Sequence, residues 1–244
     1  MTRVALAGHR GRVGAEVARA LEAAPDVEYV GGAGRGDDLE ALLRETRAQV
    51  LVDFTHPSAA LGNALAAVAA GTAPVVGTTG LDGEALDRLE GACRDAGLGG
   101  VVAPNFAVGA VLMMHLAAKA APFFEAVEVI EMHHAGKVDA PSGTALATAR
   151  LLAATGRFSY NRPQKTALEG VRGGEEEGVA VHSVRLPGLV ADQEVVFGLP
   201  GQTLTIAHRT TSREAFAPGV LLAVRRVVEE PRFYRGLDVL LGLA

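Results

Sequence analysis

Short apolar runs alternate with alanine- and leucine-rich stretches through the first hundred residues, and this alternation constrains the fold more than any other feature of the sequence. The runs predict five buried strands, at Val4–Ala7, Val27–Gly31, Val50–Phe54, Pro74–Gly77 and Gly100–Ala103. The stretches between them have helical spacing and predict four helices, at Val13–Ala23, Leu39–Arg47, Ser58–Ala70 and Glu84–Ala96. Because uniformly apolar strands are typical of a parallel sheet covered on both faces, we expect a doubly wound α/β domain with right-handed crossovers.

The pattern changes after Asn105. Helices are predicted at Val108–Ala121 and Thr144–Ala154, and strands at Ala126–Met132, Val179–Leu186, Glu194–Gly198 and Thr203–Arg209. The polar stretch Tyr160–Gly178 predicts an exposed loop. Ser212 is expected to cap a final helical region that runs to Val228 and is interrupted near Pro218 and Gly219. We therefore expect residues 1–105 to form one domain and residues 106–216 a smaller α+β domain with an open mixed sheet.

The charge balance and the cysteine content exclude several classes of protein. The chain has 23 Lys and Arg against 28 Asp and Glu, a net charge of −5, and no basic cluster, which argues against nucleic-acid binding. Its single cysteine, Cys93, rules out an intrachain disulfide and a cysteine-based metal site, and fits a reducing cytosol. No apolar run approaches the roughly 20 residues that a membrane helix needs. We expect a soluble, cytoplasmic protein.

A glycine-rich loop lies between the first predicted strand and the first predicted helix. In a dinucleotide-binding fold this position holds the phosphate loop, because glycines let the backbone approach a pyrophosphate and the helix start offers free N–H groups. Arg10 or Arg12 would add charge-assisted contacts to phosphate. The alternative is an ordinary tight turn. The candidate cofactor contacts in this loop are Gly8, His9, Arg10, Gly11, Arg12, Val13 and Gly14.

Other strand ends extend the expected nucleotide site. Arg35 follows the second strand, where NAD-binding proteins usually carry an acid, and an arginine there favours the 2′-phosphate of NADPH. The alternative is a solvated loop arginine. Small and hydroxyl residues at two further strand ends are expected to line the nicotinamide, since the carboxyl ends of parallel strands meet at one edge. These residues are Gly77, Thr78, Thr79, Ala103, Pro104, Asn105 and Phe106.

Proton-transfer and anion-binding groups concentrate in Glu131–Thr144. Histidine is the usual proton donor near neutral pH, and lysine donates a proton or holds a carboxylate. A helix start offers free N–H groups to an anion. Three alternatives are open: a zinc site, which lacks a third ligand and whose ion would be repelled by the lysine; structural histidines; and a serine that acts only as a helix cap. The candidates are His133, His134, Lys137, Ser142, Gly143 and Thr144.

These motifs together resemble the dihydrodipicolinate reductases, also called 4-hydroxy-tetrahydrodipicolinate reductases, of diaminopimelate and lysine biosynthesis. The resemblance covers nearly the whole chain, and the string His-His-x-x-Lys-x-Asp-x-Pro-Ser-Gly-Thr, which starts at His133, is its most specific part. It implies a Rossmann-like domain, to which residues 217–244 return, and a mixed-sheet domain that binds substrate and builds a homotetramer. It also implies NADPH or NADH as cofactor and a small cyclic dicarboxylate as substrate.

Carried over to this sequence, the resemblance implies that His133 is the catalytic proton donor and acceptor and Lys137 a second donor. It implies that His134, Gly143 and Thr144 bind a substrate carboxylate. From the residues themselves we expect no metal at this site. Domain closure would bring the nicotinamide to the substrate. Two departures stand out: Arg35 replaces the usual acid, and Ala191–Glu194 stands where the family commonly has Gly-Glu-His, from which we expect at most a structural consequence.

Two other functions remain open on the residues alone. A non-catalytic NAD(P)-binding sensor would use the same fold, but it gives no reason for a histidine pair and a lysine beside an anion cradle. A semialdehyde or homoserine-type dehydrogenase that works through a thioester would need a cysteine at the site. Cys93 lies in a predicted helix away from the strand ends.

Overall fold

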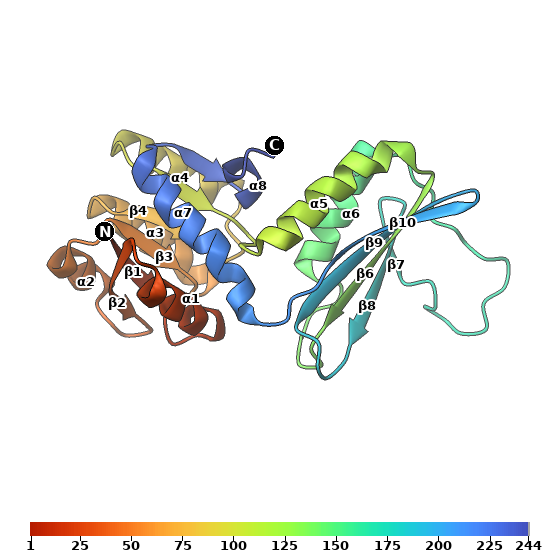
Figure 1. Ribbon diagram of the computed structural model, residues 1–244, viewed down its shortest axis with the longest axis horizontal. Helices are drawn as coiled ribbons and strands as arrows, with labels where there is room; N and C mark the ends of the chain where they lie inside the picture. The colour runs from red at the N-terminus through yellow and green to blue at the C-terminus, as the bar shows by residue number, and fades with distance from the viewer. Residues whose placement is uncertain (244) are drawn as a thin grey trace. The chain divides into compact units, whose positions relative to one another are not determined.

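The computed structural model describes residues 1–243, and the chain divides into two compact units (Figure 1). The first unit consists of Met1–Val108 and the closing segment from Arg213, and the second of Gly109–Ser212. Each unit has its own sheet. Among residues 1–243, no helix combines the length and the apolar character needed to cross a membrane.

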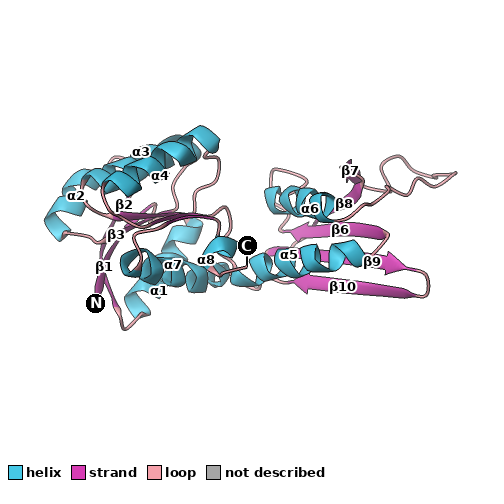
Figure 2. Cartoon of the chain, turned by 90° about the horizontal axis from the view of Figure 1, so that it is seen from above, coloured by secondary structure: helices cyan, strands magenta, loops and turns pink. Residues whose placement is uncertain are grey.

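The first unit is a parallel sheet with helices on both faces. Its strands are β1 (Thr2–Ala7), β2 (Val27–Ala33), β3 (Val50–Asp53), β4 (Ala73–Val76), β5 (Gly100–Val102) and β11 (Phe233–Arg235). They pair in parallel in the order β11-β5-β4-β3-β1-β2. Its helices are α1 (Arg12–Ala23), α2 (Leu39–Thr46), α3 (Pro57–Ala69), α4 (Gly83–Asp95), α7 (Ala217–Glu229) and α8 (Leu237–Leu240). Figure 2 shows α2, α3 and α4 on one face and α1 and α7 on the other, which confirms the doubly wound, Rossmann-like fold.

The core of this unit lies around β1 and β3. Val4–Leu6 and Val50–Val52 are completely buried between the two helical layers. Burying a valine or leucine side chain contributes roughly 1.5–3 kcal/mol, so these strands account for much of the stability of the unit. At Gly219, in α7, a Cβ atom would lie 2.2 Å from the carbonyl oxygen of Phe106. Only glycine therefore lets α7 approach the segment that follows β5.

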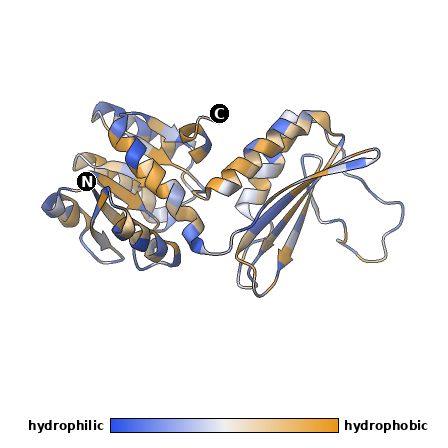
Figure 3. Cartoon of the chain, viewed as in Figure 1, coloured by the Kyte–Doolittle hydropathy of each residue, from blue (hydrophilic) through white to orange (hydrophobic). Residues whose placement is uncertain are grey.

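The second unit is a mixed sheet with helices on one face. It contains α5 (Val108–Ala120), β6 (Ala126–His133), α6 (Gly143–Thr155), β7 (Gly174–Glu176), β8 (Val179–Arg185), β9 (Ala191–Leu199) and β10 (Gln202–His208). The strand order is β10-β9-β6-β8-β7, and only the β6–β8 pair is parallel. Side chains of α5, which is mostly apolar along its length (Figure 3), and of α6 form a core with Val129 and Phe197. The expected open mixed sheet is thereby confirmed.

The structure corrects the sequence-based prediction at three places. The expected loop Tyr160–Gly178 contains the edge strand β7, whose glutamates pair with arginines instead of showing an apolar pattern. The short elements β11 and α8 were not predicted, because three or four residues carry no recognisable periodicity. Pro218 and Gly219 do not interrupt a helix: a 3₁₀ turn at Arg213–Phe216 precedes α7, and the proline lies in its first turn, where its missing N–H group is not needed.

Candidate functional site

The glycine loop between β1 and α1 is built for close backbone approach. Gly8 has a φ of +85°, and a Cβ atom there would lie 2.3 Å from the carbonyl oxygen of Phe54. A Cβ atom at Gly14 would lie 2.1 Å from the carbonyl oxygen of Gly8. Gly11 is the N-cap of α1 and leaves the N–H groups of the first turn without a side-chain cap. These features fit a pyrophosphate held against the start of a helix.

A cavity of about 910 Å³ opens at this end of the sheet. It brings together four residues predicted as cofactor contacts: Gly8, Arg10, Gly11 and Arg35. Arg10 forms an ion pair with Asp37, at 3.2 Å, whereas Arg35 is exposed and has no ion-pair partner among residues 1–243. The cavity therefore offers an unpaired guanidinium group near a glycine-rich backbone.

Four other predicted residues of the loop do not line this cavity: His9, Arg12, Val13 and Gly14. The His9 ring packs against β2, since a Cβ atom at Gly32 would lie 2.5 Å from His9 Cγ, and its buried Nδ1 has no hydrogen-bond partner. Arg12 is exposed in the first turn of α1, and Val13 is half-buried. The loop thus presents backbone rather than the side chain of His9.

The carboxyl ends of β3 and β4 are joined by a buried carboxylate. Asp53 Oδ1 accepts hydrogen bonds from the Thr55 amide (3.0 Å), the Thr55 hydroxyl (2.8 Å) and the Thr78 hydroxyl (2.6 Å), and Oδ2 accepts one from Asn63 Nδ2 (2.8 Å). Thr78 is therefore engaged in holding the strand ends together. Asn63 was not predicted as a site residue, although its amide side chain stands out in the alanine-rich sequence of α3.

The remaining predicted nucleotide contacts surround these strand ends. The Phe54 ring covers Gly77, where a Cβ atom would lie 2.3 Å from Phe54 Cε1. Phe106 is buried and meets the same ring edge-on at 5.9 Å between centroids. Asn105 Oδ1 accepts a hydrogen bond from the Ala107 amide, at 2.9 Å. Thr79 and Pro104 are exposed and Ala103 is buried, and neither Gly77–Thr79 nor Ala103–Phe106 lines the 910 Å³ cavity.

In the second unit, His133 ends β6 beside a fully buried carboxylate. Its Nδ1 lies 2.5 Å from Oε2 of Glu131, and the His133 side chain is 15% exposed. Arg185, at the end of β8, donates to both oxygens of Glu131, at 2.8 and 2.7 Å. Burial alone would raise the pKa of Glu131, but hydrogen bonds from Arg185, Ser183 and His133 outweigh it and lower that pKa. Glu131 is therefore ionised, and its Oε2 accepts a hydrogen bond from His133 Nδ1–H.

The pKa of His133 itself is lowered. Burial is the largest cause, and the positive charges of Lys137 and Arg185 act in the same direction. The hydrogen bond to Glu131 and its negative charge oppose this effect. The lowered pKa makes the protonated ring of His133 a stronger acid, which favours transfer of its proton to a reacting anion.

The start of α6 lies beside the same carboxylate. Ser142 is buried, its amide donates to Glu131 Oε1 at 3.2 Å, and its hydroxyl caps the helix by accepting from the Ala145 amide at 3.2 Å. Gly143 is exposed, and no atom lies within 4 Å of a Cβ position there. Thr144 is half-buried in the first turn. The open first turn can hold an anionic group.

Between His133 and Ser142, a turn places the lysine. The Lys137 amide donates to the carbonyl of His134 at 3.1 Å, and Lys137 Nζ donates to both oxygens of Asp139 at 2.7 and 2.9 Å. His134 is half-buried, with Nδ1 3.5 Å from a Cβ position at Gly136. Arg185 donates to the Asp139 carbonyl at 2.7 Å. Glu131 and Arg185, which were not singled out from the sequence, thus link His133 to the loop that carries Lys137.

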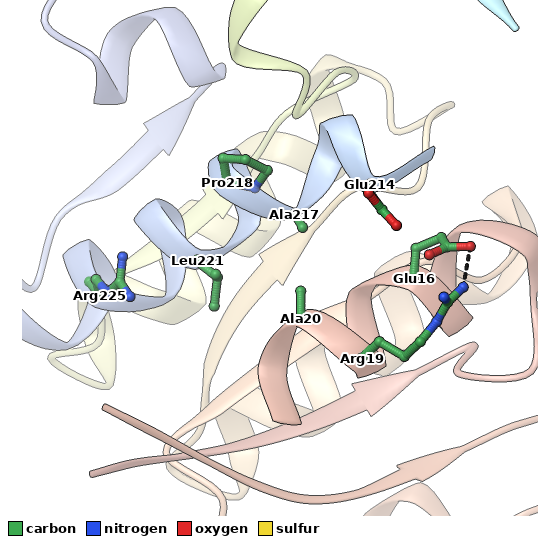
Figure 4. A pocket seen from close by; sticks show the side chains of 8 residues that line it. All are labelled: Glu16, Arg19, Ala20, Glu214, Ala217, Pro218, Leu221 and Arg225. Carbon is green, nitrogen blue, oxygen red and sulfur yellow. Dashed lines mark ion pairs between the residues drawn. The ribbon is translucent and has the colours of Figure 1, made fainter. Parts of the chain in front are cut away.

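A second cavity of the first unit, of about 570 Å³, lies between α1 and α7 (Figure 4). Its wall is formed by Ala20, Ala217, Pro218 and Leu221, with charged side chains at its rim. Glu16 pairs with Arg19, and Arg225 pairs with Asp26 outside it. None of the predicted site residues lines this cavity. Within the described part of the chain, no group of three or more His, Cys, Asp or Glu residues could hold a metal ion.

Comparison with known proteins connects both units to one enzyme family. The family description "Dihydrodipicolinate reductase, N-terminus" matches residues 2–106, and "Dihydrodipicolinate reductase, C-terminus" matches residues 109–240. The chain is 49% identical to the 4-hydroxy-tetrahydrodipicolinate reductase of Mycobacterium sp. (strain KMS), with 99% of each chain covered, and 50% identical to that of Nocardia farcinica, again with 99% of each covered. The dipicolinate-bound dihydrodipicolinate reductase of Paenisporosarcina sp. TG-14 superimposes with a TM-score of 0.90 at 36% identity, covering 98% of this chain and 99% of that one.

Proposed function

The chain belongs to the dihydrodipicolinate reductase family, and from this premise we propose how its residues reduce 4-hydroxy-tetrahydrodipicolinate to tetrahydrodipicolinate, a step toward diaminopimelate and lysine. It is an oxidoreductase that uses a pyridine nucleotide. The observation that carries the residue assignments is the cluster at the end of β6, where His133, Lys137 and the open start of α6 lie on one short segment of chain. The overall conversion removes one water and adds one hydride and one proton.

The nucleotide would be held by the glycine loop of the first unit. The positions of Gly8 and Gly14, where a Cβ atom would collide with backbone, leave a surface that fits a pyrophosphate. When bound, the reduced nicotinamide supplies the hydride. Arg35, exposed and without an ion-pair partner among residues 1–243, is suited to pair with a 2′-phosphate, so we propose that NADPH is preferred to NADH.

The substrate dicarboxylate would be bound by the second unit. One carboxylate is held by His134, Lys137 and the first turn of α6 at Ser142–Thr144. Lys137 exchanges its Asp139 partner for this carboxylate, an exchange made easy by the exposure of Asp139, whose side chain is 54% accessible. This arrangement orients the ring of the substrate and neutralises the negative charge of its carboxylate.

Protonation is assigned to the same segment. Hydride addition leaves an anion, and His133 delivers the balancing proton through Nε2, since Nδ1 is occupied by Glu131. Lys137 is the second donor. A well-placed general acid contributes roughly 10²–10⁴-fold to the rate.

We also propose a cytoplasmic homotetramer, assembled through the face of the second sheet that α5 and α6 leave uncovered. Ile130 and Met132 on β6 and Val196 on β9 alternate with the core residues and are only partly buried. A second copy of this chain would complete their burial. Light scattering after size-exclusion chromatography measures the mass of the assembly. The single, buried cysteine, Cys93, fits a reducing compartment.

The test of the proposed function is direct. Absorbance of NADPH and NADH is followed with freshly generated substrate. Oxidation is expected with both nucleotides and should be faster with NADPH at low concentration. Binding of nucleotide without oxidation of either would instead favour a non-catalytic sensor.

A further inference from the structure

Glu131 is a charged group in a place where charge is costly. It lies on β6 and has no exposed surface, on the face of the sheet that α6 covers. A buried carboxylate is tolerated only where its oxygens are fully hydrogen-bonded and its charge is matched. Both oxygens of Glu131 accept hydrogen bonds: Oε2 accepts from His133 and Arg185, Oε1 accepts from Arg185 and the Ser142 amide, and the Ser183 side chain adds another.

Arg185 connects this carboxylate to the rest of the site. In the parallel pairing of β6 with β8 it lies directly opposite His133. Its two terminal nitrogens also donate to the carbonyl oxygens of Val184 and Asp139, both at 2.7 Å. The guanidinium group therefore fixes the position of Glu131 relative to the end of β6 and to the loop that carries Lys137.

The arrangement determines what His133 can do. With Nδ1 held by an ionised carboxylate, the ring cannot rotate freely, and no residue among 1–243 pairs with Nε2. We propose that Glu131 and Arg185 are positioning residues: Arg185 holds Glu131 in place, and Glu131 orients His133 and stabilises its protonated form, so that Nε2 transfers the proton. This role rests on the proposed function of His133.

The charged groups that face His133 set the expected pH dependence. Glu131 favours the protonated ring, whereas Lys137, Arg185 and burial disfavour it. Loss of the Glu131 charge removes the favourable contribution, so the pKa of His133 falls further. Because a proton donor must be protonated, kcat declines as pH rises through this pKa, and the decline moves to lower pH in a variant without the charge.

The test is Glu131→Gln, with Glu128→Gln as a matched control. Glu128 lies on the same strand and also accepts from a histidine (His182, 2.7 Å) and an arginine (Arg172), but on the opposite face. We expect Glu131→Gln to lower kcat about 10- to 100-fold, with KM for the substrate little changed and the alkaline decline of kcat shifted to lower pH. Glu128→Gln should leave that decline where it is in the unaltered enzyme.

Glu131→Gln leaves the half-buried guanidinium group of Arg185 beside a neutral partner and can prevent folding. The double variant Glu131→Gln/Arg185→Met removes both charges and should fold. Its decline should still shift to lower pH, but by less than in Glu131→Gln, because the charge of Arg185 that opposes protonation of His133 is also removed. A pH profile like that of the unaltered enzyme in either folded variant would overturn the proposal. If His133→Ala retains turnover, the proposed function of His133 fails instead.

Discussion

Lys137 Nζ lies 2.7 and 2.9 Å from the two carboxylate oxygens of Asp139, so the lysine assigned to the substrate already has a partner within its own turn. The hydrogen bond from Lys137 lowers the pKa of Asp139. The pair lies two residues apart in sequence, and the Asp139 side chain is half exposed. An incoming dicarboxylate must compete with Asp139 for the same ammonium group.

Replacing Asp139 by asparagine should therefore favour substrate binding. An exposed ion pair is worth at most about 1 kcal/mol, so KM for the substrate is expected to fall by no more than about fivefold, with kcat nearly unchanged. Steady-state kinetics at saturating nucleotide measure both quantities. A rise in KM would mean that Asp139 orients Lys137 instead of competing with the substrate.

Removing either proposed proton donor should impair chemistry and not nucleotide binding. His133→Ala and Lys137→Ala are each expected to lower kcat by at least about 10²-fold while the Kd for NADPH stays close to that of the unaltered enzyme. Lys165→Ala, which removes an exposed lysine elsewhere in the same unit, is the control and should have no effect. Turnover near that of the unaltered enzyme in both His133→Ala and Lys137→Ala would refute the assignments.

Asp53 should be more important for stability than its single charge suggests. Asp53→Ala removes the acceptor of four hydrogen bonds, from the amide and hydroxyl of Thr55, from Asn63 and from Thr78, and is expected to cost about 2–4 kcal/mol of unfolding free energy. Asp82→Ala removes only an exposed helix cap and should cost about 1 kcal/mol. Urea unfolding of both variants measures the loss of unfolding free energy in each. Equal losses would show that the Asp53 network is not structural.

Arg35 should determine the choice of nucleotide. Arg35→Ala is expected to raise KM for NADPH about tenfold and to leave KM for NADH nearly unchanged, since a charge-assisted contact to the 2′-phosphate is worth about 1.5–3 kcal/mol and is weakened by exposure. Arg47→Ala, outside the cavity, serves as the control. An equal effect on both nucleotides would place Arg35 away from the 2′-phosphate.

Most of the first unit could be predicted from its sequence, because its strands are uniformly apolar and its helices have a clear period. The glycine loop could also be predicted from the sequence. Close backbone contacts require glycine at Gly8 and Gly14, and these two positions lie within one short stretch of chain. The strand β11 gave no such signal, because it has three residues and gains its partner, β5, from a distant part of the chain.

The site at the end of β6 was predictable only in part. His133, Lys137 and Ser142 lie close together in sequence, so a short motif reveals them. Arg185 could not be predicted in this way, because its contact with Glu131 spans 54 residues of sequence and depends on which strands pair. The orientation of His9 was also hidden, since packing against Gly32 decides it.

Two carboxylates of β6 make the same connection to β8. Glu128 bonds to His182 and Glu131 to Arg185, each across 54 residues and on opposite faces of the sheet. A one-residue slip between the strands would break both contacts at once and turn the buried Glu131 and the partly exposed Glu128 toward unlike neighbours. The register of β6 with β8, which creates the site, is therefore specified by charge as well as by the apolar pattern. A chain with these strands misaligned would lose an ion pair on each face of the sheet and would be less stable even without substrate.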